Sequence, residues 1–286
     1  MSAACDSVDD LTRQHPKWTA WLALVRFAIG EMESDAWDTM RLLPSPARDR
    51  AAPLMAHAVL HVDSREVERL LDALTSHASG QGSAGVAIER DFASRCEPMP
   101  SLEAALNRDR ERLAQCIGPA PDADACAAVL SLSAKPLLHA CRRLCAQAVA
   151  QSWQQGYCPI CAGWPAFAEV RGVERTRYLR CGDCGHGWPA LALKCAYCGT
   201  TDHDALESLV PEQRTATASV EVCNRCRGYL KVFTTLRGAS PAQVLVRALA
   251  SAEFDLAALE LGYRGASGVG HALTLKVVPD GVRSAH

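Results

Sequence analysis

Eight cysteines between positions 158 and 226 are the residues of this chain best suited to chemistry. They form four C-x-x-C pairs within 69 residues: Cys158/Cys161, Cys181/Cys184, Cys195/Cys198 and Cys223/Cys226. The two thiolates of one such turn can bind the same metal ion, and two turns complete a closed, four-coordinate site. The pattern therefore predicts two four-cysteine metal sites.

The lengths between the pairs favour sequential pairing. Nineteen residues separate the first pair from the second and twenty-four separate the third from the fourth, both suited to a β-hairpin, whereas ten form the connector between them. The expected sites are Cys158, Cys161, Cys181 and Cys184, and Cys195, Cys198, Cys223 and Cys226. A crossed arrangement stays open, because spacing alone does not determine connectivity.

Glycine recurs just after these pairs, at Gly163, Gly185, Gly199 and Gly228. A cysteine turn needs a residue there that tolerates a left-handed backbone, which glycine does without steric cost. The recurrence indicates a duplicated zinc-ribbon or rubredoxin-like module. Four thiolates suit either zinc or mononuclear iron, and a closed site has no open position for a substrate, so a structural role is expected.

The elements that position these modules follow from composition along the chain. Residues 1–155 are rich in leucine and alanine at helical spacing, and near Gly156 they give way to short alternating segments typical of strands. Ser240-Pro241 predicts the start of a closing helix that ends at Gly262. The predicted class is α+β, divided into a helical domain (1–155), a first metal module (156–192), a second metal module (193–238), and a C-terminal helix with a flexible tail (239–286).

The helical half carries no predicted catalytic group. Its expected helices cover residues 18–32, 53–77, about 101–117, and about 122–155, the last kinked or split by Pro136. His57 and His61 lie four apart on the second of these, but the sequence HAVLH lacks the glutamate of a metalloprotease. The six cysteines outside the C-x-x-C pairs share no spacing and are expected to be ordinary packed residues.

Charge and hydropathy narrow the class of protein. Residues 156–236 contain nine Lys or Arg against eight Asp or Glu, so the module lacks the cationic excess that nucleic-acid binding requires. The sequence contains no run of 18 apolar residues, so no membrane span is predicted. The N-terminal sequence MSAACDSVDD is acidic where a signal peptide would be basic, and a cytoplasmic protein is expected.

The residues around the cysteines carry a more specific signal. The series CPIC, RYLRCGDCGHGW, KCAYCG and EVCNRCRGYLK resembles the formate dehydrogenase accessory protein FdhE family. The family's flanking residues fall on Tyr178-Leu179, Trp188, Glu221-Val222 and Tyr229-Leu230-Lys231. Generic zinc ribbons share the cysteines but not these flanks. Two positions depart from the family: Val246-Arg247-Ala248 replaces an acidic pair, and Gly265 replaces a second arginine after Arg264.

The resemblance implies a non-enzymatic assembly factor, or chaperone, for protein maturation. Such a protein binds the catalytic, molybdenum-containing subunit of a respiratory formate dehydrogenase, is needed for its activity, and carries two rubredoxin-like sites for iron or zinc. We expect the metals to hold the ribbons so that their exposed flanks, with the helical domain, form the docking surface. A rubredoxin-like iron protein in electron transfer or redox sensing is the alternative, followed by a nucleic-acid-binding ribbon. Homo-oligomer formation is left open.

Overall fold

The computed structural model describes residues 2–45, 49, 51–80, 96–120, 122–210 and 217–280 of the 286-residue chain. The chain divides into two compact units. The first comprises Met1–Arg48, Met55–Leu144 and Leu273–His286, and the second comprises Asp49–Leu54 and Cys145–Ala272. Each unit thus combines segments that are distant in the sequence.

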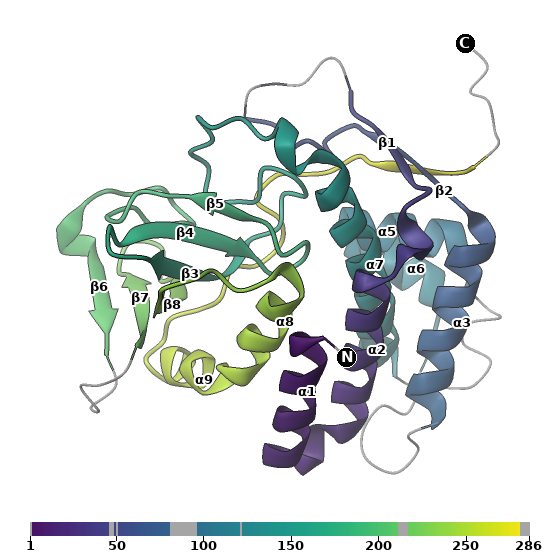
Figure 1. Ribbon diagram of the computed structural model, residues 1–286, viewed down its shortest axis with the longest axis horizontal. Coiled ribbons are helices and arrows are strands. Elements are labelled where there is room, and N and C mark those ends of the chain that lie inside the picture. Colours follow the sequence, from purple (N-terminus) through teal and green to yellow (C-terminus); the bar gives the residue numbers. More distant parts are fainter. Residues whose placement is uncertain are drawn as a thin grey trace. The chain divides into compact units, whose positions relative to one another are not determined.

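Helices make up most of the first unit (Figure 1). They are α1 (Ala3–Gln14), α2 (Thr19–Glu33), α3 (Ser64–Gly80), α5 (Pro98–Asn107), α6 (Arg110–Ile117) and α7 (Ala123–Cys145). The apolar positions of α2 at Leu22, Val25 and Ile29 are at most 1 % exposed, which is the core-facing stripe that their spacing predicted. No helix among the described residues is both long and apolar enough to cross a membrane.

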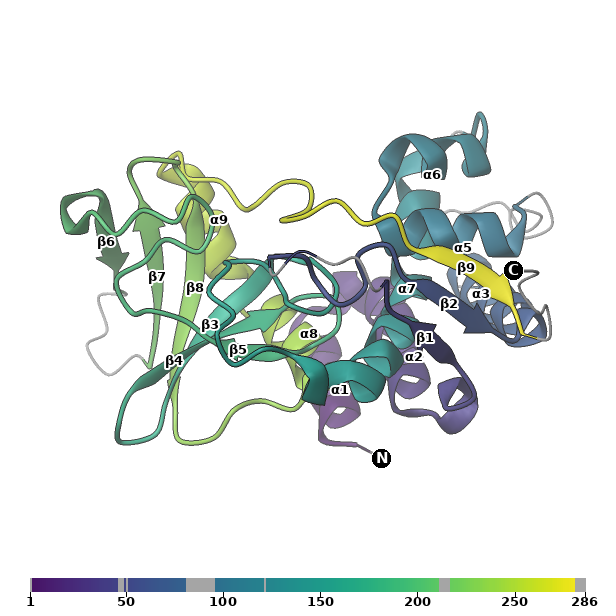
Figure 2. The same ribbon diagram turned by 90° about the horizontal axis from the view of Figure 1, so that it is seen from above.

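A small sheet, which the sequence did not predict, completes this unit. It contains β1 (Arg41–Leu43), β2 (Val59–Val62) and β9 (Lys276–Pro279), with β1 antiparallel and β9 parallel to β2 (Figure 2). The prediction of a helix over residues 53–77 is therefore wrong for the residues before Ser64, where α3 begins. His61 lies in β2 and His57 in the turn before it, so the two do not share a helical face. The valines of β2 suit a strand, but its partner β9 lies more than 200 residues away in the sequence.

Two further helix predictions need correction. The helix expected near 101–117 is two helices, because Arg108 adopts a left-handed conformation (φ 55°) and Asp109 caps α6 through the backbone N–H of Arg112. The last helix of this half runs through Pro136 without splitting and ends at Cys145, well before residue 155.

One six-stranded sheet organises the second unit. Its strands are β3 (Pro165–Arg171), β4 (Thr176–Cys181), β5 (Gly187–Pro189), β6 (Leu206–Leu209), β7 (Ala218–Cys223) and β8 (Tyr229–Thr235). Their order is β5-β4-β3-β8-β7-β6, so each cysteine-rich module contributes three neighbouring strands. The modules meet where β3 and β8 pair in parallel, with Phe167 opposite Lys231 (Figure 2). The predicted α+β class with tandem modules is confirmed, and the two modules share one sheet.

The closing helix predicted over 241–261 consists of two shorter helices, α8 (Pro241–Ala250) and α9 (Ala252–Glu260). Ser240 and Gln243 form a capping box at the start of α8, as the Ser-Pro signal predicted. At the break, the Ser251 hydroxyl donates to the carbonyl oxygens of Arg247 and Ala248. Such local hydrogen bonds compete with the continuing helix ladder.

A buried carboxylate attaches the start of α8 to the sheet. Glu169 of β3 is fully buried and accepts hydrogen bonds from the backbone N–H of Ala239 at 2.9 Å and from Arg180 at 2.9 Å. Arg171 donates to the same carboxylate at 2.5 and 2.8 Å, and Arg247 of α8 lies 3.4 Å from it. Burial alone would raise the pKa of Glu169, but the Ala239 N–H and the guanidinium groups of Arg180 and Arg171 lower it.

Candidate metal centres

The four C-x-x-C turns have the same backbone hydrogen bonds. In each turn the N–H of the first cysteine donates to the carbonyl oxygen five residues later, for example from Cys158 to Gly163 at 2.9 Å. The N–H four residues after that cysteine donates back to its carbonyl oxygen, for example from Ala162 to Cys158 at 3.1 Å. The same two bonds recur at Cys181, Cys195 and Cys223, with lengths of 2.8–3.2 Å. The sequence repeat is therefore a structural repeat.

The residue after the second cysteine of every turn has a left-handed backbone. It is Ala162 (φ 61°), Gly185 (φ 70°), Gly199 (φ 72°) and Arg227 (φ 58°). The requirement for such a conformation was predicted correctly, but in two turns a non-glycine residue adopts it. Gly228 serves a different purpose, because a Cβ atom there would lie 2.6 Å from the ring of Tyr197.

Two hairpins bring the turns together in sequential order. The β3–β4 hairpin joins the first turn to the second, and the β6–β7 hairpin joins the third to the fourth. The resulting groups are Cys158, Cys161, Cys181 and Cys184, and Cys195, Cys198, Cys223 and Cys226. We call them the first cluster and the second cluster. Within each, all four sulfur atoms lie within 4.8 Å of one another.

The sulfur separations match a tetrahedral site. In the first cluster, Cys158 and Cys184 are 3.5 Å apart, as are Cys161 and Cys181. In the second, the separations are 3.7 Å between Cys195 and Cys226, and 3.8 Å between Cys198 and Cys223. A tetrahedron with metal–sulfur bonds of about 2.3 Å has edges of about 3.8 Å, whereas a disulfide would require about 2.05 Å. The clusters could therefore each hold one metal ion.

The two clusters differ in their exposure to solvent. All four cysteines of the first cluster are fully buried. In the second cluster Cys198 is exposed and Cys226 is half-buried. In the first, the backbone N–H groups of Ile160 and Asp183 donate to sulfur at 3.4 Å and can stabilise thiolate charge.

Burial dominates the electrostatics of the thiols. It raises the pKa of Cys158 and Cys184 well above the usual value, and it raises the pKa of Cys195 in the second cluster. At Cys223 burial is outweighed by hydrogen bonds from the backbone N–H groups of Cys226 and Arg225, so the pKa is lowered. Buried thiolates need a cation, and coordination to a metal deprotonates a thiol outright. Zinc or iron thus fits both donor sets, and an ion bound in either cluster would link the two cysteine turns that one hairpin brings together, while leaving no coordination position for a substrate.

The flanking residues that carry the family resemblance are largely buried, contrary to the expected exposed docking flanks. Trp188 is 1 % exposed and donates from Nε1 to the Gln155 carbonyl at 3.1 Å. Lys231, 4 % exposed, donates to Asp255 at 2.8 Å and to the Ala248 carbonyl at 2.9 Å. Lys231 thus holds α8 and α9 against the sheet, because the carbonyl of Ala248 lies in the last turn of α8 and Asp255 belongs to α9.

The segment after α9 packs on the fourth cysteine turn. Tyr263 donates to the side chain of Asn224 at 2.8 Å, and the guanidinium of Arg227 lies 4.0 Å above the Tyr263 ring. The backbone of Arg264 bonds to Arg227 and Tyr229. Arg247, which departs from the family pattern, lies beside Glu169 and over the Phe233 ring. In this chain both departures occur in parts of the second unit that pack against its own sheet.

The remaining cysteines and histidines do not extend the sites. No cysteine outside the C-x-x-C pairs belongs to a potential metal-binding group among the described residues. Cys96, Cys126 and Cys141 are buried, and Cys5, Cys116 and Cys145 are half-buried. His61 and His139 are buried.

An ion pair between the modules was missed from the sequence. Arg177 of β4, 4 % exposed, donates to Glu221 of β7 at 2.5 Å, across the two intervening strands β3 and β8. In a flat sheet these strands would be about 14 Å apart, so the pair depends on side chains that reach over the sheet face. The two residues are 44 positions apart, and no local pattern relates them.

Comparison with known proteins gives a consistent result. No family model matches the chain. Protein FdhE of Escherichia coli O127:H6 (strain E2348/69 / EPEC) is 33 % identical over 82 residues, which is 28 % of this chain and 26 % of that protein. The crystal structure of the FdhE protein from Pseudomonas aeruginosa covers 95 % of this chain and 94 % of its own, with a TM-score of 0.63 and 23 % identity.

The predicted resemblance to FdhE is confirmed. The sequence match spans about a quarter of the E. coli protein. The structural match extends the shared fold to nearly the whole chain, the helical first unit included.

Proposed function

We propose that this chain is a cytoplasmic accessory protein of the FdhE type. It binds the catalytic subunit of a respiratory molybdenum formate dehydrogenase and is needed for that enzyme's activity. The likeness to FdhE proteins, in sequence over 82 residues and in fold over 95 % of the chain, carries the proposal. The chain itself is not an enzyme in this proposal, since four-cysteine sites leave no coordination position for a substrate.

The eight clustered cysteines are the proposed metal ligands, one zinc or iron ion for each cluster. Their separations of 3.5–3.8 Å support this assignment. The metals would stabilise the two modules, residues 156–192 and 193–238, which act as one body because β3 and β8 pair. A structural metal supplies folding free energy to a domain of short strands with a small core.

The test combines genetics with purification. Deletion of the gene is expected to abolish formate oxidation by the respiratory enzyme, and the tagged protein is expected to co-purify with the catalytic subunit. Cys161→Ser should fail to restore activity, whereas Cys5→Ser, outside both clusters, should restore it fully. Normal formate oxidation after deletion would overturn the proposal.

Electron transfer at the second cluster is the second candidate function. The exposure of Cys198 favours it, because a metal beside that sulfur would lie close to solvent and to a redox partner. It predicts thiolate-to-iron absorption in the visible range and reversible bleaching by dithionite. A colourless purified protein with two zinc ions would exclude it.

A further inference from the structure

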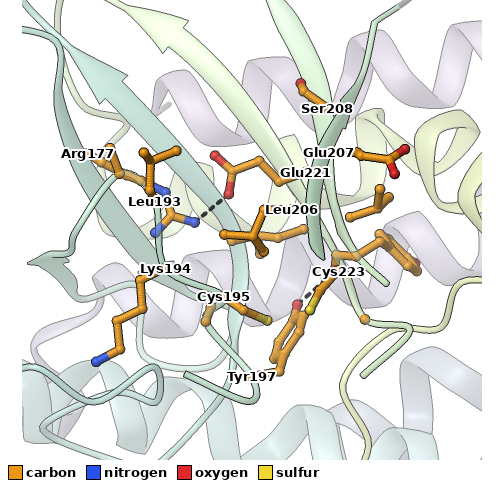
Figure 3. Close-up of a pocket in the computed structure, with 16 residues that line it drawn as sticks. Arg177, Leu193, Lys194, Cys195, Tyr197, Leu206, Glu207, Ser208, Glu221 and Cys223 are labelled. Carbon is orange, nitrogen blue, oxygen red and sulfur yellow. Dashed lines mark hydrogen bonds and ion pairs between the residues drawn. The ribbon is translucent and has the colours of Figure 1, made fainter. Parts of the chain in front are cut away.

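Two adjoining pockets lie on either side of the connector between the metal modules, within the second unit. The first, of about 200 Å³, borders the second cluster and is drawn in Figure 3. The second, of about 240 Å³, lies between β4, the connector and residues 151–156. Four residues line both pockets: Arg177, Lys194, Cys195 and Ala196.

The two pockets differ in the charged side chains that line them. The first is lined by Glu207 and Glu221 together with aliphatic side chains such as Leu206. Figure 3 shows Glu221 facing Arg177, and Lys194 turned away from this pocket. The second pocket contains both cations and three glutamines, Gln151, Gln154 and Gln155, and no acidic residue of the described chain lines it. We call it the cationic pocket.

The cations of this pocket have hydrogen-bonding capacity left. Arg177 donates from its terminal nitrogens to the Leu191 carbonyl at 3.1 Å and to Glu221 at 2.5 Å. Its Nε is buried and has no acceptor within the described part of the chain. A buried donor left without a partner costs about 1–3 kcal/mol. Lys194 donates to the Gln154 carbonyl at 3.0 Å, and none of the described carboxylates forms an ion pair with it.

Exposed leucines flank the same connector. Leu191 is 59 % exposed and Leu193 is 66 % exposed. Each lines one pocket, Leu191 the cationic one and Leu193 the first. Exposed apolar side chains gathered beside pockets are characteristic of interaction surfaces.

We propose that the cationic pocket binds an acidic side chain in an extended segment of the client subunit, while a neighbouring aliphatic side chain of that segment enters the first pocket. Arg177 is already paired with Glu221, so the ammonium of Lys194 supplies the charge that selects the carboxylate, and the apolar walls around Leu193 and Leu206 select its neighbour. This inference rests on the proposed function, since it identifies where and by what chemistry the client docks.

The test uses the full-length, metal-loaded protein and overlapping 15-residue peptides of the catalytic subunit, followed by fluorescence anisotropy. Acidic peptides should bind, and Lys194→Gln should weaken them roughly fivefold. Arg237→Gln removes an exposed cation that lines neither pocket and is the matched control, with no expected change. Circular dichroism and metal content would verify that each variant is folded.

Charge reversal makes the test specific. Lys194→Glu should abolish binding of the acidic peptide, and replacing the peptide's acidic residue by lysine should restore it. A peptide affinity that is unchanged by Lys194→Glu would overturn the docking site. The proposed function would still stand if the protein co-purified with the client. Displacement of the peptide by sodium acetate at equal concentration would also overturn it, since the pocket would then be a small-anion site. Failure of the unsubstituted protein to co-purify with the client would overturn both.

Discussion

The two clusters share their backbone geometry and differ in their surroundings. The four cysteine turns repeat the same pair of hydrogen bonds, and the sulfur–sulfur contacts between paired turns are 3.5 Å in the first cluster and 3.7 and 3.8 Å in the second. Yet all four cysteines of the first cluster are buried, while the second leaves Cys198 exposed to solvent. Identical local motifs can therefore yield one sealed site and one accessible site, and the difference comes from what packs over them.

The largest effect expected from this difference concerns the ligands themselves. Cys161→Ser should unfold much of the second unit, because a buried metal site then lacks a thiolate that water cannot replace. Cys198→Ser should cost less, since solvent can reach the vacated corner. We expect a difference of at least about 3 kcal/mol in the free energy of unfolding, measured by urea denaturation together with metal content. Equal losses in the two variants would contradict the contrast.

The carboxylates that attach the closing helices provide a second comparison. Glu169 is fully buried among three arginines, Arg171, Arg180 and Arg247, whereas Asp255, 31 % exposed, pairs with Lys231 beside the second cluster. Removing Glu169 leaves three guanidinium groups without their buried carboxylate, at a cost of about 3–5 kcal/mol, whereas removing the partly exposed Asp255 leaves one ammonium that still donates to the Ala248 carbonyl. Glu169→Gln should therefore destabilise the protein more than Asp255→Asn in matched chemical denaturation.

The same carboxylate predicts a pH dependence. Because the pKa of Glu169 is lowered in the folded state, its contribution to stability is complete above the unfolded value of about 4.3 and is lost as the pH falls through the folded value. Between pH 7 and pH 3, the free energy of unfolding measured by chemical denaturation should fall less for Glu169→Gln than for the unsubstituted protein. Parallel curves would show that this carboxylate does not titrate as expected.

Two glycines test packing at equal backbone strain. Gly185 and Gly199 occupy equivalent left-handed positions, with φ of 70° and 72°. A Cβ atom at 185 would lie 2.5 Å from the Pro241 carbonyl oxygen, whereas at 199 the nearest atom is 3.8 Å away. Gly199→Ala should cost about 1–2 kcal/mol from strain alone, and Gly185→Ala about 1–3 kcal/mol more. Similar melting temperatures for the two variants would show that the backbone at Pro241 can shift to accommodate the added Cβ atom without loss of stability.

The smallest expected effect is kinetic. A chelator such as EDTA should remove metal at least about tenfold faster from the second cluster than from the first. This ratio corresponds to a difference of about 1.4 kcal/mol in the activation barrier to metal release. Native mass spectrometry should then detect a one-metal species, and alkylation should label Cys198 before any cysteine of the first cluster. Release of both ions together, or labelling of Cys161 first, would refute the difference in accessibility.

Local patterns were sufficient for the ligand groups and for several element boundaries. The spacing of the cysteines favoured the sequential grouping that the structure shows, because a hairpin of 19 or 24 residues brings neighbouring turns together, but it left a crossed arrangement open. The capping box at Ser240 and the core stripe of α2 likewise depend on residues within a few positions of one another. The candidate metal-binding groups were therefore accessible from the sequence.

Long-range contacts decided the remainder. The parallel pairing of β3 with β8 merges the modules into one sheet, and β9 completes a sheet with β2, although no periodicity relates these segments. The left-handed Ala162 and Arg227 show that the turn imposes its backbone even without glycine. The two similar cysteine clusters follow from local spacing in the sequence. That one is buried and the other partly exposed follows only from tertiary packing, because solvent exposure depends on segments far from the cysteines.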